Sequence, residues 1–439
     1  MSKLKMPSVI VAFEEKGIEA IQRSQRSIVL LILEQDGKDM TKDYLNIYTI
    51  DDIPEDLTDE NKEYIKLALL GYQTAPKKVI VYFIPPVPTT ATAETGAGEG
   101  TASGDGADLD AGGEATAGDT TETTTTEETG AGEGTASGDG ADLDTGEEAA
   151  AGDTTETTTT AKQDYTKILR VIETVEFVYL AIPQIQPENV PDIANWIKSM
   201  RTTKDIMVNA VLPNINADCE GVINFTNSII RTKTKSYTAA QYCARVAGLL
   251  AGTPMTISAT YAPLNELVEV ERNTKEEMDA RVSNGEFFFF SDGQKIKVAR
   301  AVNSFVTTYQ GRGDDFKFIK IMNLLDMIHN DIKWTGHDSY IGKYANNASN
   351  RALLITAING YFKTLETEGL LERNQNRSYI DYEAVKNWRE SNGLNTRDEL
   401  EAMSEKELEV LNLHENVFIA ADLSPLNAIE NITVKCAID

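Results

Sequence analysis

The sequence predicts an α/β fold in the first half of the chain and an α+β fold in the second, on three observations. Apolar runs typical of buried strands alternate with amphipathic helix patterns as far as Leu212. A hairpin pattern around Asp292 is followed by long helix patterns with apolar residues three and four apart. The 439 residues are enough for two or three hydrophobic cores.

The α/β prediction rests on elements that alternate along the chain. Residues 27–33 form an apolar run suited to a buried strand, and residues 58–72 open with a capping Thr58 before turning apolar. A second buried strand, residues 78–84, stops at two prolines. Such alternation predicts a mainly parallel or mixed sheet covered by helices. The same order continues later, with helix 164–174, strand 176–182, helix 190–200 and strand 205–212.

The second half has a different pattern. Residues 287–290 and 295–299 flank Asp292-Gly293, which predicts a hairpin with a type I′ turn and with Ile296 and Val298 on one side. A Glu-rich helix with a solvated face is predicted over residues 397–413. Two longer helices are predicted from the stripes Phe318, Ile321, Leu325, Ile328, Ile332 and Leu354, Ile358, Tyr361, Leu365.

A low-complexity insert, residues 89–161, interrupts the α/β half. It contains 18 Asp and Glu but no Lys or Arg, and residues 94–110 recur as residues 128–144. Gly, Ala and Thr dominate, so the insert cannot bury an ordinary core and is interpreted as a solvated acidic linker. Calcium binding is the alternative, through the carboxylates Asp105, Asp108, Asp110, Asp139, Asp142 and Asp144, although their spacing is neither that of an EF-hand loop nor that of a nonapeptide β-roll.

Composition excludes several classes of function. A net charge of −28 argues against nucleic-acid binding, which depends on cations. The three cysteines Cys219, Cys243 and Cys436 lie far apart, so neither a disulfide framework nor a zinc site is predicted. No stretch of about 18 apolar residues occurs, and we expect a soluble, non-secreted protein without membrane insertion.

The sequence offers no catalytic, cofactor-binding or metal-binding residues. The strand ends carry none of the glycine-rich or serine motifs of nucleotide-binding or hydrolytic enzymes. His329, His337 and His414 stand in no metal or nucleophile pattern, and solvated roles are predicted for them. A cytoplasmic α/β enzyme with a non-standard site stays open as an alternative.

Both ends of the chain have the alternation of a β-strand. Residues 8–13 place Val9, Val11 and Phe13 on one side. Residues 431–438 do the same with Ile432, Val434, Cys436 and Ile438. These strands either close the sheet of their own subunit or add to a free edge of a neighbouring copy. The residues alone favour the first interpretation.

Four separated blocks carry a family resemblance. They are the opening MPSVIVAFEEKGIEAIQRSQRSIVLLILEQ, YCARVAGLLAGTP from Tyr242, KVARAVNSFVT from Lys297, and YIGKYANNASNRALLITAINGYFKTLETEGLL from Tyr340. In this order they resemble the tail-sheath proteins of contractile phages and of phage-tail-like bacteriocins of Gram-positive hosts. The resemblance covers the chain apart from the insert.

The resemblance implies a structural protein that is not an enzyme and needs no cofactor. Its subunits would form stacked hexameric rings around a tail tube and contract to drive the tube through the host envelope. The expected partners are other copies of the chain, the tube protein, and baseplate and tail terminator proteins. The expected location is a virion tail assembled in the host cytoplasm, and the sheath of a non-phage contractile injection system is the close alternative.

The resemblance also implies a domain organisation and reverses the interpretation of the termini. Strand exchange between subunits is now favoured, carried by Val9, Val11, Phe13, Ile432, Val434, Cys436 and Ile438. The expected parts are an N-terminal arm (1–20), an outer α/β domain (21–88 and 162–270), the insert (89–161), an inner α+β C-terminal domain (271–425) and a C-terminal arm (426–439).

Overall fold

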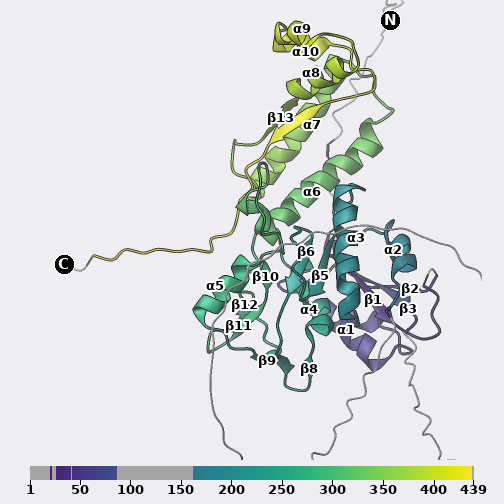
Figure 1. Cartoon of the computed structure of the whole chain (residues 1–439), viewed down its shortest axis with the longest axis vertical. Helices are drawn as coiled ribbons and strands as arrows, with labels where there is room; N and C mark the ends of the chain where they lie inside the picture. The colour runs from purple at the N-terminus through teal and green to yellow at the C-terminus, as the bar shows by residue number, and fades with distance from the viewer. Residues whose placement is uncertain (1–19, 22–25, 41, 87–161, 438–439) are drawn as a thin grey trace, which may run out of the picture. The chain divides into compact units, whose positions relative to one another are not determined.

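The computed structural model describes residues 20–21, 26–40, 42–86 and 162–437. A seven-stranded sheet has the order β10-β6-β5-β4-β1-β3-β2, and every neighbouring pair is parallel except β2 with β3 (Figure 1). The predicted mixed α/β fold is confirmed. The strands are β1 (Ile28–Glu34), β2 (Tyr44–Ile47), β3 (Lys78–Ile84), β4 (Tyr179–Ala181), β5 (Asn209–Pro213), β6 (Val222–Phe225) and β10 (Glu286–Phe287).

The central strand β1 fills two cores with alternate side chains. Val29, Leu31 and Leu33 pack with α1 (Asp59–Leu69) and α4 (Ala239–Ala251) on one face of the sheet. On the other face Ile28, Leu30 and Ile32 pack with α2 (Thr166–Ile172) and α3 (Val190–Thr202). A strand that is covered on both faces must be apolar at every position, which explains the unbroken run in the sequence.

The sequence located some elements and missed others. Thr58 accepts a hydrogen bond from the Asn61 N–H at 3.2 Å, so the predicted cap of α1 is confirmed. Strands β2 and β6 were missed, and Phe287 of the strand predicted over 287–290 belongs instead to β10, which has only two residues and lies at an edge of the sheet. Strand β10 lies beyond residue 270, where the domain boundary was predicted. One strand of the large sheet therefore comes from the segment that was assigned to the C-terminal domain.

The predicted hairpin exists, but its turn differs. Strands β11 (Phe289–Ser291) and β12 (Ile296–Val298) pair antiparallel, while Phe287 belongs to β10 of the large sheet. Four residues join the strands, and among them only Gly293 has a left-handed φ, of 91°. The type I′ prediction is therefore wrong. Asp292 determines the turn instead, since its Oδ1 accepts the N–H groups of Gln294 and Lys295 at 2.8 and 2.7 Å.

The C-terminal part is α+β. Helices α6 (Ile319–Thr335) and α7 (Ala348–Thr367) share an apolar core, and β13 (Arg377–Ile380) pairs antiparallel with β14 (Ile419–Asp422). The helix predicted over 397–413 is wrong, because Ser404 caps a new helix with Glu407. The remaining elements are β7 (Ile230–Thr232), β8 (Ser236–Tyr237), β9 (Leu267–Val270), α5 (Lys275–Ser283), α8 (Tyr382–Ser391), α9 (Arg397–Glu401) and α10 (Glu405–Val410).

Candidate functional site at the roots of the terminal segments

The carboxyl edge of the parallel sheet is where an α/β enzyme would bind its ligand. Here polar side chains at the strand ends bond to one another. The Glu34 N–H donates to Gln184 Oε1 at 2.9 Å, and Asn61 Nδ2 donates to the Glu34 carbonyl and to Gln35 Oε1, both at 2.9 Å. These contacts join the ends of β1 and β4 to the first turn of α1.

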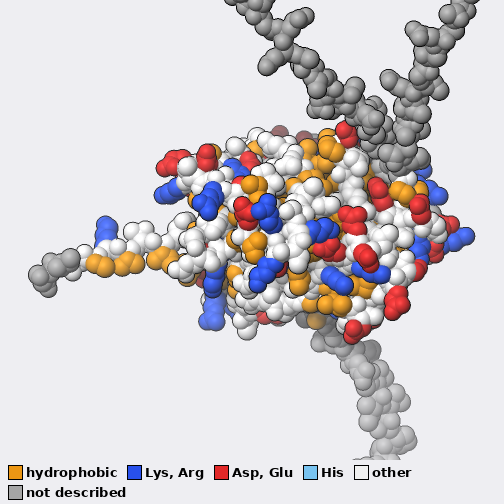
Figure 2. Space-filling model, turned by 90° about the horizontal axis from the view of Figure 1, so that it is seen from below, with side chains coloured by type: hydrophobic (Ala, Val, Ile, Leu, Met, Phe, Trp, Pro, Cys, Tyr) orange, Lys and Arg blue, Asp and Glu red, His pale blue; other side chains and the backbone are white. Residues whose placement is uncertain are grey.

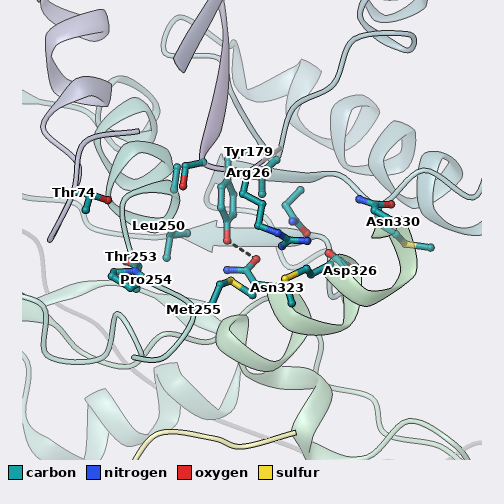
Figure 3. Close-up of a pocket in the computed structure, with 16 residues that line it drawn as sticks. Arg26, Thr74, Tyr179, Leu250, Thr253, Pro254, Met255, Asn323, Asp326 and Asn330 are labelled. Carbon is teal, nitrogen blue, oxygen red and sulfur yellow. Dashed lines mark hydrogen bonds between the residues drawn. The ribbon is translucent and has the colours of Figure 1, made fainter. Parts of the chain in front are cut away.

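A cavity of about 250 Å³ lies at the opposite, amino ends of β1, β4 and β5, against helix α6. Figure 3 shows Tyr179 and Asn323 meeting across it, with the Tyr179 hydroxyl donating to Asn323 Oδ1 at 2.7 Å. Burial raises the pKa of the Tyr179 hydroxyl, so this group stays a hydrogen-bond donor. The cavity thus lies at the interface between the sheet and α6.

A buried ion pair at this interface joins α3 to α6. Arg201 on α3 donates to both carboxylate oxygens of Asp326 on α6, at 2.8 and 2.7 Å. Both side chains are less than a tenth exposed. Two parallel bonds fix the relative orientation of the helices as well as their distance, so α6 is held firmly against the sheet.

Near its C-terminal end, α6 also contacts Arg26, which lies just before β1. The Arg26 guanidinium lies 3.7 Å from the carboxylate of Asp331, a buried residue of α6. The Tyr361 hydroxyl from α7 donates to the same carboxylate at 2.6 Å. Arg26, which we take as the root of the N-terminal segment, therefore lies against the C-terminal half of α6.

The C-terminal segment is fixed near the other end of α6. Lys320, in the first turn of the helix, donates to the Leu426 carbonyl, while the Leu426 N–H donates to the Leu370 carbonyl at 3.0 Å. Farther along, Glu430 Oε2 accepts from Arg300 Nε at 2.7 Å. One helix thus lies next to the roots of both terminal segments.

Beyond Glu430 the chain extends into solvent. Residues 431–437 are exposed and form no strand in the single chain, where Ile432 is 79% and Val434 75% exposed. Figure 2 shows hydrophobic side chains along one side of this projecting segment. The predicted strand residues Ile432, Val434 and Cys436 therefore lie on an unpaired segment. Ile438, Val9, Val11 and Phe13 lie outside the described residues.

The histidines have surface roles. His329 Nε2 lies 2.8 Å from Asp205 Oδ1 at a partly exposed position, and the ring of His337 packs against Trp334. In the ranges that the structure describes, no group of three or more His, Cys, Asp or Glu could hold a metal ion. Within the same ranges no helix is long and apolar enough to cross a membrane.

Comparison with known proteins identifies the family. A family model described as the phage tail sheath protein central domain matches residues 159–304, and one described as the phage tail sheath C-terminal domain matches residues 312–439. The tail sheath protein of Clostridium phage phiCD119 is 30% identical over 433 residues, which cover 98% of each chain.

Solved structures show the same fold. The sheath tail protein of Desulfitobacterium hafniense aligns with a TM-score of 0.58 at 21% identity, over 85% of this chain and 94% of that one. The contracted helical sheath of the anti-feeding prophage aligns with a TM-score of 0.60 at 12% identity, over 99% and 100%. The chain belongs to the contractile tail sheath family, and like its relatives it is a structural sheath subunit and not an enzyme.

Proposed function

We propose that the subunit polymerises as stacked hexameric rings around a tail tube and contracts to drive the tube through the host envelope. In this proposal neighbouring subunits exchange strands through Val9, Val11, Phe13, Ile432, Val434, Cys436 and Ile438. Baseplate, tail terminator and tube proteins are its partners, and assembly takes place in the host cytoplasm. The inner domain (271–425) and the two arms face the tube, while the outer domain (21–88 and 162–270) and the insert face outward.

The observation that carries the proposal is the exposure of alternating apolar side chains beyond Glu430. Ile432 and Val434 would lose most of their accessible surface in a paired strand, and apolar burial is favourable by about 25 cal/mol per Å². An isolated strand also leaves its backbone groups unpaired, and another strand can satisfy them. A segment of this kind requires the free edge of a β-sheet with which it can pair.

The fold offers such an edge. Strand β14 belongs to a two-stranded sheet and pairs only with β13 among the described residues. On the other strand, the side chain of Asn359 bonds to both backbone groups of Ser378, with Ser378 N–H to Oδ1 at 2.6 Å and Nδ2 to the carbonyl at 3.2 Å. Since Asn359 occupies the outer side of β13, we propose β14 of a neighbouring subunit as the acceptor.

Contraction then requires subunits that move as rigid bodies while their links persist. The Arg201–Asp326 pair holds α6 against the sheet, and α6 lies next to both arm roots. Energy is stored as a difference between two packings of the same interfaces, summed over many subunits.

Electron microscopy of the purified chain tests the proposal. We expect hollow tubes or rings from the full-length protein, and soluble monomers after deletion of residues 1–13. Tubes formed by the truncated chain would contradict strand exchange. A sheath of a non-phage injection system is the second candidate, because the anti-feeding prophage sheath shares the fold. Native particles isolated from the producing cells decide between the two: a capsid on these particles would exclude this candidate, and its absence would favour it.

A further inference from the structure

Glu430 is a buried acid within an otherwise exposed segment. Its side chain is 8% exposed, whereas the preceding Ile429 is 86% and the following Ile432 79% exposed. The carboxylate accepts three hydrogen bonds, from Arg300 Nε at 2.7 Å, Thr260 Oγ1 at 2.7 Å and Ser258 Oγ at 3.1 Å. Polar contacts therefore hold Glu430 against the subunit, whereas the apolar side chains on either side of it do not pack there.

The groups that receive Glu430 are themselves fixed. The Arg300 guanidinium stacks over the Phe318 ring at 5.1 Å, immediately before α6. Thr260 Oγ1 accepts the Ala301 N–H at 3.0 Å, so the hydroxyl is oriented toward the carboxylate. A charge-assisted bond to a pre-oriented guanidinium is stronger than a neutral one and has a defined direction.

We propose that Glu430 is the positioning residue of the C-terminal arm: it fixes where the arm leaves the subunit and so which neighbour the arm can reach. This inference rests on the proposed strand exchange. Leu426 is the preceding backbone contact, so loss of the Glu430 contact lengthens the free tether from the nine residues 431–439 to the thirteen residues 427–439.

The length of the tether determines the effective concentration of the arm at its acceptor. Effective concentration falls roughly as the −3/2 power of tether length, which predicts a decrease of about two-fold for Glu430→Ala from length alone. Loss of a fixed exit direction adds to this effect. Glu430→Gln keeps an oxygen for the two hydroxyls but loses the ion pair with Arg300, so its effect is intermediate.

The test measures the concentration at which full-length protein assembles, by sedimentation and negative-stain imaging. We expect the half-maximal concentration to rise at least about two-fold for Glu430→Ala and less for Glu430→Gln. The matched control is Glu415→Ala, an exposed acid of the same C-terminal part, which leaves assembly unchanged. Unassembled Glu430→Ala stays folded, with a melting temperature only slightly below that of the wild type, because Arg300 is already a third exposed and water can solvate its charge.

A spin label measures arm position directly. In a Cys436→Ser background the other two cysteines are buried, so a label on Asn431→Cys reports the residue next to the pivot. We expect a restricted spectrum in dilute wild-type protein and a mobile one with Glu430→Ala. An equally restricted spectrum in both proteins would overturn the inference.

A third chain separates this inference from the function on which it rests. Deletion of residues 431–439 removes the arm and leaves Glu430 in place. If this truncation abolishes assembly while Glu430→Ala assembles at the wild-type concentration, the positioning role is wrong and strand exchange stands. If the truncated chain assembles like the wild type, strand exchange by this arm is wrong, and the positioning role is overturned with it.

Discussion

Arg201 and Asp326, on different helices, make a two-point ion pair with bonds of 2.8 and 2.7 Å in the interior of the subunit. Because both charges are desolvated, removal of one partner leaves the other buried and uncompensated. We expect Arg201→Met to lower the free energy of unfolding by about 3–5 kcal/mol in chemical denaturation.

Two further variants check the origin of that loss. Arg201→Met combined with Asp326→Leu removes both charges and recovers most of the stability. The exposed pair Arg231–Glu269 has a similar distance of 2.6 Å, yet Arg231→Met costs less than about 1 kcal/mol because water screens this pair. Equal losses at both sites would show that burial is not the cause.

Gly248 lets two helices approach closely. It lies in α4, where a Cβ atom would stand 2.0 Å from the Ala68 carbonyl oxygen of α1. We expect Gly248→Ala to lower stability by about 1–3 kcal/mol through overpacking, even though alanine is the better helix former by about 1 kcal/mol. The control is Gly360→Ala in α7, where no atom of the residues that the structure describes lies within 4 Å of the added Cβ and stability should rise. Thermal unfolding measures whether each substitution lowers or raises the stability.

Glu34 makes stability depend on pH. Burial, and then the nearby Glu60 carboxylate, raise the pKa of Glu34, and its Oε1 has no hydrogen-bond partner among the described residues. A raised pKa means that the folded state binds the proton more tightly than the unfolded state, so stability is lost as pH rises through the folded-state pKa. We expect Glu34→Gln to raise the melting temperature near pH 7, with the gain disappearing below the ordinary pKa of 4.5.

Glu366 is the control, because its pKa is shifted in the opposite direction and stability therefore depends on pH with the opposite sign. Hydrogen bonds from Asn376 and Lys363 lower the pKa of its carboxyl to about 2. Its contribution is complete above the ordinary value of 4.5 and is lost as pH falls toward about 2. Glu366→Gln therefore lowers the melting temperature at neutral pH. If both variants shift it in the same direction, the electrostatic explanation is wrong.

The ends that flank the acidic insert lie close together. Gln163 Nε2 donates to the Pro85 carbonyl at 3.2 Å, so a linker of about four residues in place of residues 89–161 is long enough to leave this contact between the described ends intact. We expect the shortened chain to assemble normally and, by loop-closure entropy, to be more stable by about 2 kcal/mol. Failure to assemble would show that the insert supplies contacts between subunits. Calcium titration of the full chain by thermal shift tests the alternative role of its Asp residues.

The three cysteines form a natural probe of the arm. Burial raises the pKa of the Cys219 and Cys243 thiols, whereas Cys436 is exposed. A thiol reagent should modify one group per chain in native, unassembled protein and three after denaturation. In assembled tubes Cys436 should become protected, because strand exchange would cover it. Full reactivity in the tubes would place the arm outside any interface.

The sequence by itself determined the elements whose signals are local. The run before Glu34 marks a strand buried on both faces, and Thr58 marks a helix start, because periodicity and capping involve neighbouring residues. The alternation of Ile432 and Val434 likewise predicted the terminal strand on which the proposed exchange depends. Only the tertiary structure decided that Arg201 meets Asp326 and that Arg300 holds Glu430, because these partners lie 125 and 130 positions apart. The periodicity of a sequence does not predict such a pairing, because the tertiary fold decides which distant residues come into contact.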